Sequence, residues 1–220
     1  MQLTKLRILI ADDHELVRRG LKVLLSPRPN WIVCGEAISG REAVALATQH
    51  QPDIVIMDIS MPGLNGLEAT RKIRKALPKT QVLILSLHYS DQLVRDVIDA
   101  GARGYLLKSD ASRDILNAVE ALASHRPFFT SGAAQIVLDG FCKQGSAPER
   151  IPVKGQRLSS REREIVQLLA EGQSSKEVAV TLGISVKTAE THRSNIMRKL
   201  EIHSVSELVR YAVKNQMIEP

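Results

Sequence analysis

Chemistry-bearing side chains stand where four short apolar runs of the chain end. They are Asp12 and Asp13, after KLRILIA; Asp58, in DIVIMDIS; Ser86, in QVLILSL; and Lys108, after GYLL. Short apolar runs of this kind predict strands buried on both faces of a parallel sheet. Ligands of open α/β sheets bind beyond the carboxyl ends of the strands, so we expect these side chains to form a site.

The chemistry that these residues could perform is metal-assisted phosphoryl transfer. In the strand order 2-1-3-4-5 the first and third strands are neighbours, which would bring three carboxylates into one pocket. Close carboxylates repel one another, and an all-oxygen pocket with access to water suits Mg²⁺. A lysine ammonium and a serine hydroxyl complete the equipment for phosphoryl transfer. Taken singly, each aspartate could instead cap the following helix, and Lys108 could be a solvated strand end.

Strand-like and helix-like segments alternate five times over the first part of the chain. The expected strands cover residues 5–11, 31–37, 53–59, 81–87 and 104–107, and the expected helices cover 16–25, 39–50, 67–77, 92–100 and 115–122. This alternation predicts a parallel sheet with helices on both faces, joined by right-handed crossovers. The predicted fold class is therefore α/β, with a five-stranded flavodoxin-like sheet of order 2-1-3-4-5.

The last part of the chain predicts a small all-α module of four short helices. Capping boxes are expected at three of their starts, formed by Ser159 with Glu162, Ser174 with Glu177, and Ser204 with Glu207. A helix, a short glycine-bearing turn and a longer polar-faced helix are typical of a helix-turn-helix, whose second helix enters the major groove. Any small helical bundle contains such turns, so this pattern by itself fits either a DNA-binding helix-turn-helix or an ordinary helical bundle.

Between the two modules the helical periodicity weakens. Residues 126–156 are punctuated by glycine and proline, although 133–138 could form a short helix. The polar, turn-rich part of this segment is typical of a flexible linker. We therefore expect a first domain over 1–125, a linker over 126–156 and a second domain over 157–220.

Composition restricts the class of protein further. Hydrophobic residues make up 44% and charged residues 25%, as in ordinary soluble domains. The apolar runs are strand-sized and the first residues lack a signal-peptide pattern, so we expect a cytoplasmic protein without a membrane partner. Cys34 and Cys142 are expected to be free thiols, and no His/Cys spacing predicts zinc. The net charge of +6 is concentrated towards residues 121–220, which fits nucleic acid without requiring it.

Two stretches resemble known domains. Residues 6–122 resemble the receiver domain of two-component response regulators in the Asp-Asp pair, the central aspartate, the serine and the lysine. The sequence LSSREREIVQLLAEGQSSKEVAVTLGISVKTAETHRSNIMRKL closely resembles the LuxR-type output domain, a similarity that covers 158–215. The whole chain thus resembles the NarL/FixJ subfamily. This resemblance implies a phosphorylation-controlled, DNA-binding transcription regulator that is no enzyme beyond its own phosphorylation and slow dephosphorylation.

The resemblance implies roles for the receiver residues in phosphoryl chemistry. Asp58 would accept a phosphoryl group from a histidine kinase, and Lys108 would pair with the phosphoryl oxygens. Ser86 would move to hydrogen-bond those oxygens, and Tyr105 would turn inward behind it. Many receivers have a cis-proline after the lysine, whereas this chain has Ser109. A cis bond before a non-proline residue costs about 3 kcal/mol, so the geometry of this loop is left open.

The same resemblance implies a Mg²⁺ site. Asp13, Asp58 and the backbone carbonyl of Ser60 would hold the ion, with Asp12 acting through a bound water.

The resemblance also assigns the residues that would contact DNA on a recognition helix over about 186–200. Base-facing positions are Glu190, Thr191 and Ser194, and candidates for phosphate contact are Lys187, Thr188, Arg193, Asn195 and Lys199. Glu190 could accept a hydrogen bond from cytosine N4. Alternatively it could only pair with Lys187 and Arg193 along the helix, for about 0.2–0.5 kcal/mol per pair. His192 is expected in the core rather than at DNA.

The expected partners are double-stranded DNA with paired half-sites and a second copy of the chain. The last helix, 204–216, has an apolar stripe. In the family this helix forms the dimer seam on DNA, so the resemblance implies a homodimer when phosphorylated, although packing within the domain also explains much of the stripe. RNA polymerase is a further partner that such a regulator could contact.

Two alternatives stay open. One is an Mg²⁺-dependent phosphatase with an aspartate nucleophile, although such enzymes usually carry Asp-x-Asp after the first strand. The other is a regulator that binds DNA independently of phosphorylation.

Overall fold

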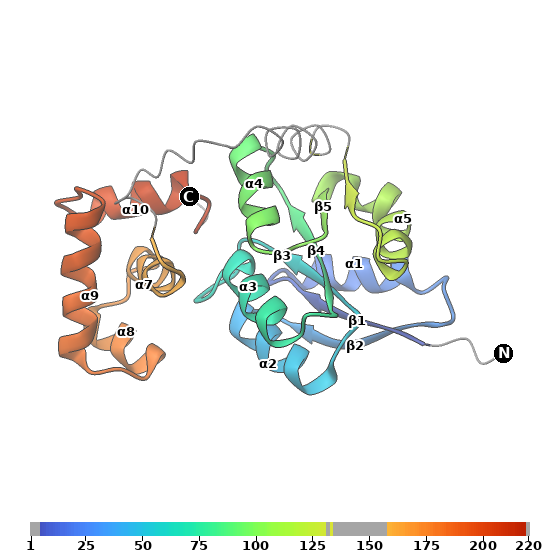
Figure 1. Cartoon of the computed structure of the whole chain (residues 1–220), viewed down its shortest axis with the longest axis horizontal. Coiled ribbons are helices and arrows are strands. Elements are labelled where there is room, and N and C mark those ends of the chain that lie inside the picture. Colours follow the sequence, from blue (N-terminus) through green and yellow to red (C-terminus); the bar gives the residue numbers. More distant parts are fainter. Residues whose placement is uncertain (1–4, 131–132, 134–157, 219–220) are drawn as a thin grey trace, which may run out of the picture. The chain divides into compact units, whose positions relative to one another are not determined.

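The computed structural model describes residues 5–130, 133 and 158–218, which form two compact units that we describe separately (Figure 1). In the described residues the first unit contains a six-stranded sheet of order β2-β1-β3-β4-β5-β6 in which all neighbours are parallel. The strands are β1 (Leu6–Ala11), β2 (Trp31–Ala37), β3 (Ile54–Asp58), β4 (Gln81–Ser86), β5 (Gly104–Leu107) and β6 (Phe128–Phe129). The predicted α/β class and the order 2-1-3-4-5 are confirmed.

Helices cover both faces of this sheet. They are α1 (Glu15–Leu25), α2 (Gly40–His50), α3 (Gly66–Ala76), α4 (Asp91–Asp99) and α5 (Ala111–Ala123). Alternate strand residues such as Ile8 and Ile54 pack in one core cluster with Leu21 of α1 and Ile115 of α5. The residues between them, such as Leu9, are also fully buried, because α2 and α3 pack together on the opposite face. Because both faces of these strands are buried, their sequences are continuously apolar and do not alternate between apolar and polar residues.

The sixth strand corrects the expected count of five. Phe128 and Phe129 pair in parallel with Gly104 and Tyr105 of β5, in a segment that we expected to be linker. A strand of two residues is too short to produce a periodic signal, and the packing of Phe128 against the core cluster explains why it joins the sheet. The short helix expected over 133–138 falls, apart from the helical and buried Ala133, outside the described residues.

The turn after β3 depends on a glycine. A Cβ atom added to Gly66 would lie 1.8 Å from the carbonyl oxygen of Asp58, a separation that no side chain tolerates. The Gly66 amide donates a 2.8 Å hydrogen bond to the carbonyl of Ile59. The first turn of α3 is thereby held directly against the backbone of Asp58.

The second unit packs its four described helices around one core. They are α7 (Ser160–Ala170), α8 (Ser175–Leu182), α9 (Val186–Lys199) and α10 (Val205–Lys214). Buried residues from every helix contribute, among them Ile165, Val178, Ile196 and Leu208. The turn between α8 and α9 begins at Gly183, which has a positive φ of 64°. This is the predicted helix-turn-helix arrangement.

The expected capping boxes form at two helices and only in part at a third. Both reciprocal bonds are present at Ser159 and at Ser174. At α10 the Ser204 hydroxyl accepts from the Glu207 amide, but the Glu207 carboxylate accepts from the amide of His203. The third box was therefore wrong in its second bond, because the carboxylate reaches the amide one residue further from the helix.

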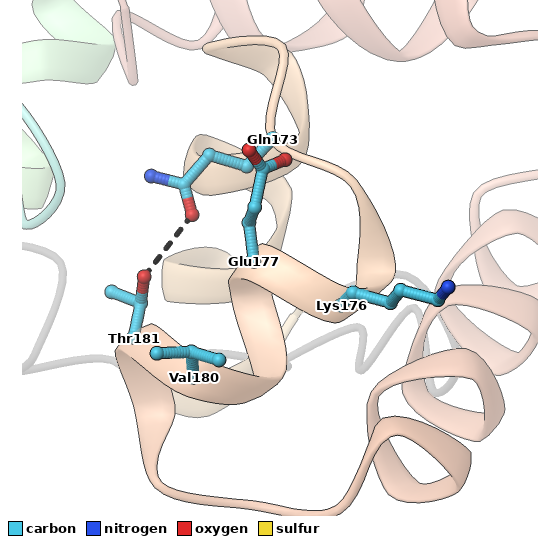
Figure 2. Close-up of a pocket in the computed structure, with 5 residues that line it drawn as sticks. All are labelled: Gln173, Lys176, Glu177, Val180 and Thr181. Atoms are coloured by element: carbon cyan, nitrogen blue, oxygen red, sulfur yellow. Dashed lines mark hydrogen bonds between the residues drawn. The ribbon is translucent and has the colours of Figure 1, made fainter.

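The outer side of α8 carries a shallow hollow of about 410 Å³, lined by Gln173, Lys176, Glu177, Val180 and Thr181 (Figure 2). The Thr181 hydroxyl donates to the Gln173 side chain at 3.3 Å, and Val180 is 84% exposed. The hollow is open and gathers no set of groups that could perform chemistry. Among the described helices, none combines the length and the hydropathy that crossing a membrane would need.

Candidate functional site

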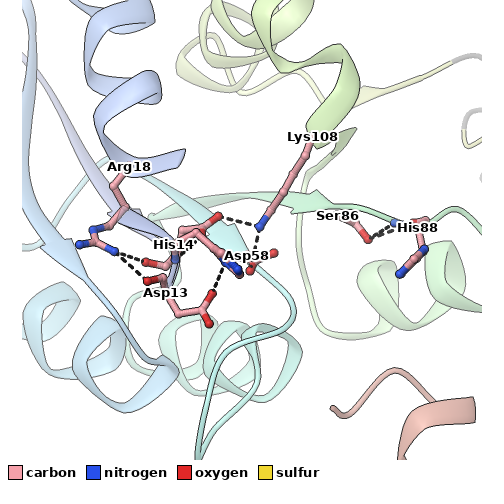
Figure 3. A network of polar contacts seen from close by, with 8 residues as sticks. Asp13, His14, Arg18, Asp58, Ser86, His88 and Lys108 are labelled. Carbon is pink, nitrogen blue, oxygen red and sulfur yellow. Dashed lines mark hydrogen bonds and ion pairs between the residues drawn. The ribbon is translucent and has the colours of Figure 1, made fainter. Parts of the chain in front are cut away.

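The expected acidic cluster forms at the carboxyl edge of the sheet (Figure 3). Asp58 is the last residue of β3, and Asp12 and Asp13 directly follow its neighbour β1. Together with His14, these side chains place one potential ligand atom each within 4.8 Å of one another. Asp12 and Asp58 are buried, whereas Asp13 and His14 face solvent. The cluster is therefore buried on the side of Asp12 and Asp58 and open to solvent on the side of Asp13 and His14.

Lys108 joins the cluster from β5. Its Nζ atom lies 2.8 Å from Asp12 Oδ2 and 3.0 Å from Asp58 Oδ2, and its side chain is only 10% exposed. One ammonium therefore bridges the ends of β1 and β3 from a residue that follows β5. Close to a phosphoryl acceptor, such a cation would neutralise incoming negative charge.

Burial and ion pairing together set the pKa values of this cluster. Burial raises the pKa of Asp58 to about 6, with the charge of Lys108 acting against this rise and Asp12 adding to it. Burial alone would lower the pKa of Lys108, but its ion pairs with Asp58 and Asp12 outweigh burial and raise that pKa above its usual value. Three carboxylates face one ammonium, so the site has an excess of negative charge. Oxygen donors with solvent access on one side fit Mg²⁺.

His14 also belongs to the cluster, although the sequence had not marked it as a site residue. Its Nδ1 lies 2.7 Å from Asp13 Oδ1 and 3.4 Å from Asp12 Oδ1, and its backbone amide donates to Asp12 Oδ1 at 2.9 Å. The available signal was its position immediately after the two aspartates. Arg18 of α1, whose guanidinium donates to the carbonyls of Asp12 and Asp13, was not predicted either, because it belongs to no recognisable motif.

The two expected switch residues meet at a carbonyl in the loop after β4. The Ser86 hydroxyl donates to the carbonyl of His88 at 2.9 Å and accepts from the His88 amide at 3.1 Å. The Tyr105 hydroxyl donates to the same carbonyl at 2.6 Å, and burial raises the pKa of Tyr105 to about 12. Ser86 is thus turned towards His88 in Figure 3. Ser60 lies half-buried beyond β3, and its carbonyl stays a predicted ligand.

The loop after Lys108 takes a regular form. Residues Lys108–Asp110 make a 3₁₀ turn that leads directly into α5. In the described part of the chain no peptide bond is cis, so the bond between Lys108 and Ser109 is trans. Ser109 thus replaces the usual proline without a cis bond before it.

The expected DNA-contacting residues lie on or near the exposed face of α9. Exposed side chains are Lys187, Thr188, Glu190, Thr191, Ser194 and Asn195, while Arg193 and Lys199 are half-buried. His192, which was expected in the core, is half-buried. The Ser185 hydroxyl accepts from the Thr188 amide and so caps the helix at this end.

Several of these side chains already have partners. The Thr191 hydroxyl donates to the Lys187 carbonyl at 2.8 Å, and the Thr188 hydroxyl shares a 2.7 Å hydrogen bond with Ser185. Lys199 Nζ lies 2.8 Å from the carboxylate of Glu162, a residue of the α7 capping box.

Glu190 differs from these residues. Within the part of the chain that the structure describes, its carboxylate makes no ion pair with Lys187 or Arg193. The alternative in which Glu190 only pairs along the helix is therefore not realised here. An exposed carboxylate on this helix face can accept a hydrogen bond from outside the chain.

A parallel sheet with an acidic cluster and a lysine at its carboxyl edge, followed by a helix-turn-helix unit, defines the class of response regulators. Residues 8–120 match the family model of the response regulator receiver domain, and residues 156–212 match that of bacterial regulatory proteins of the luxR family. The chain belongs to the response regulator family, with a LuxR-type output domain. It is a two-component transcription regulator rather than a classical enzyme.

Relatives of the chain extend over its whole length. The transcriptional regulatory protein LiaR of Bacillus subtilis (strain 168) is 37% identical, covering 97% of this chain and 99% of LiaR. The oxygen regulatory protein NreC of Staphylococcus carnosus (strain TM300) is 37% identical, covering 97% of this chain and all of NreC (100%). A solved structure of two RcsB dimers bound to two parallel DNAs is 25% identical with a TM-score of 0.56, covering 94% of this chain and 97% of RcsB.

Proposed function

We propose that Asp58 accepts a phosphoryl group from a histidine kinase in the cytoplasm, and that this modification switches the binding of the second unit to double-stranded DNA. The observation that carries the proposal is the pairing of Lys108 Nζ with a buried carboxylate at a strand end, 3.0 Å away. A carboxylate oxygen of Asp58 forms the new bond to phosphorus, and the bond from phosphorus to the histidine nitrogen of the kinase breaks. The product is an acyl phosphate.

The neighbouring charges make this transfer feasible. Asp13, Asp58 and the carbonyl of Ser60 would hold Mg²⁺, with Asp12 acting through water. When bound, this ion would neutralise the charge of the transferring group. Lys108 already lies against the acceptor and would pair with the phosphoryl oxygens once they arrive. Its charge attracts the anionic donor and stabilises the product.

The proposed switch is local. A phosphoryl group on Asp58 offers hydrogen-bond acceptors that compete with the His88 carbonyl for the Ser86 hydroxyl. If Ser86 leaves His88, the loop after β4 loses both hydrogen bonds to Ser86 and keeps the one from Tyr105, whose side chain already lies inward and buried. A small electrostatic change can in this way bias a two-state surface.

The proposed DNA contact is made by α9. Lys187, Thr188, Arg193 and Asn195 would hold phosphates, and Lys199 could do so after leaving Glu162. Bases would be read by Glu190, Thr191 and Ser194. Glu190 offers only acceptor oxygens and so selects an exocyclic amine such as cytosine N4. Since the Thr191 hydroxyl is bound to the helix, its methyl group is the part suited to contact thymine.

Dimerisation completes the proposal. Val205, at the start of α10, is 47% exposed, and Val209 and Val213 on the same helix are half-buried. A second copy joined along α10 would present two recognition helices to paired half-sites. RcsB, a relative, has been seen as dimers bound to DNA, which supports this arrangement. RNA polymerase would be the further partner at a promoter.

Phosphoryl uptake tests the proposal. The purified chain is incubated with acetyl phosphate and Mg²⁺ and weighed by intact mass spectrometry. We expect the addition of one phosphoryl group that is absent from Asp58→Asn. Sustained turnover of an aryl phosphate would instead favour the phosphatase. No uptake, with DNA binding retained, would favour a regulator that acts without phosphorylation.

A further inference from the structure

Arg18 reaches from α1 to the backbone of both aspartates that follow β1. Its Nη1 atom donates to the carbonyl of Asp12 at 2.8 Å and to the carbonyl of Asp13 at 3.2 Å (Figure 3). The Arg18 side chain is only 13% exposed. A single guanidinium nitrogen thus engages two consecutive peptide groups of the acidic loop.

These two carbonyls lie where regular structure is interrupted. The Asp12 amide still bonds to Ala37 of β2, and the carbonyl of His14 accepts from amides in the first turn of α1. The carbonyls of Asp12 and Asp13 lie between the sheet ladder and the helix, and Arg18 supplies donors to both. Since a carbonyl direction fixes its peptide plane, the guanidinium constrains the backbone that carries the two carboxylates.

The guanidinium also faces a carboxylate on the neighbouring strand, although its buried Nε atom makes no hydrogen bond. Arg18 Nε lies 3.6 Å from Oε2 of Glu36 on β2, and the same carboxylate pairs with Lys22 Nζ at 2.8 Å. Glu36 is in register with Ile10 of β1. Glu36 is therefore a nearby charge partner of Arg18, while the guanidinium hydrogen-bonds to the carbonyls of the acidic loop.

We infer that Arg18 is a positioning residue of the Mg²⁺ and phosphoacceptor site. By holding both carbonyls it fixes the directions in which the Asp12 and Asp13 carboxylates point, without contacting the ion or the phosphoryl group. Groups that orient metal ligands in this way typically contribute 10–100-fold to metal affinity. The inference rests on the proposed function, since it concerns the ion that this site would hold.

The test is the Mg²⁺ dissociation constant of the full chain, measured by titration calorimetry. Arg19→Met is the matched control, because Arg19 is the next residue of the same helix, is exposed and pairs with Glu15 instead. We expect Arg18→Met to weaken Mg²⁺ binding at least about 10-fold and Arg19→Met to leave it unchanged. Arg18→Lys keeps the charge but loses the planar group, so its affinity should fall between those of wild type and Arg18→Met.

The outcomes separate this inference from the proposed function. An Arg18→Met chain that is folded and binds Mg²⁺ as Arg19→Met does would overturn the positioning role, even if it unfolds more easily in EDTA. If Arg18→Met does not fold, Arg18→Lys decides: reduced affinity supports the role and wild-type affinity contradicts it. A wild-type chain that does not bind Mg²⁺ would contradict the proposed function itself.

Discussion

The ammonium of Lys108 lies 3.0 Å from the carboxylate of Asp58. The same atom lies 2.8 Å from Asp12, so one cation ties together the ends of β1, β3 and β5. The proposed phosphoacceptor is therefore already paired with the group that would meet the phosphoryl oxygens. Breaking a buried ion pair of this kind lowers the free energy of unfolding, because removal of one partner leaves the other charge uncompensated.

Removal of the lysine should destabilise the receiver. For Lys108→Met we expect a loss of on the order of 3 kcal/mol in the free energy of unfolding at neutral pH in EDTA. Lys22→Met is the control, because Lys22 pairs with Glu36 at the surface and such a pair contributes about 1 kcal/mol or less. Urea denaturation measures both. Equal losses in the two variants would mean that the buried pair is no stronger than the exposed one.

The raised pKa of Asp58 predicts a pH dependence of stability. Burial lifts this pKa from its usual 3.8 to about 6, so the folded chain holds the proton more tightly than the unfolded chain. The stabilisation is complete below about pH 4 and is lost as pH rises through 6. The stability of Asp58→Asn relative to wild type, measured in EDTA, should therefore rise by on the order of 1 kcal/mol between pH 5 and pH 8. Denaturation at both pH values checks this, and a difference of the opposite sign would refute it.

The glycine after the β3 loop should be irreplaceable. In Gly66→Ala the new methyl group would lie 1.8 Å from the Asp58 carbonyl, so the start of α3 or the end of β3 must move. We expect lower stability, by on the order of 2 kcal/mol, and slower phosphoryl uptake from acetyl phosphate. Gly20→Ala is the control: it lies in α1 with nothing within 4 Å, and should stabilise by about 0.5–1 kcal/mol. Equal behaviour of the two variants would disprove the steric account.

Two residues of α9 should affect DNA binding in different ways. Glu190→Ala should lose preference at one base pair, expected to be cytosine, by about 1–3 kcal/mol. Lys187→Ala should weaken binding to all sequences similarly and reduce the salt slope by about 1. Selection of bound DNA fragments followed by salt titrations measures both effects. An unchanged base preference in Glu190→Ala would remove Glu190 from the base-reading set.

Much of the fold follows from local patterns. The apolar runs of β1 and β3 and their terminal aspartates predict the edge at which the acidic cluster forms, because parallel strands end together. The lysine after β5 could be assigned to the same edge for the same reason. The capping boxes at Ser159 and Ser174 depend on residues three apart, so the sequence displays them directly.

Contacts between distant segments could not be predicted in this way. β6 has two residues and no periodicity, and it forms only because β5 offers an open edge beside the core. Arg18 donates to the backbone carbonyls of Asp12 and Asp13, and contacts to the backbone cannot be predicted from the types of the residues contacted. Lys199 and Glu162 lie 37 positions apart, so only the folded structure shows that this lysine has a partner within its own domain.

The central claim is tested most directly by the affinity of the chain for its selected DNA, measured by fluorescence anisotropy with and without acetyl phosphate and Mg²⁺. Wild type should bind more tightly when the phosphodonor is present, and Asp58→Asn should bind with one affinity under both conditions. If wild type and Asp58→Asn respond identically to the donor, the modification of Asp58 does not control DNA binding and the account is contradicted.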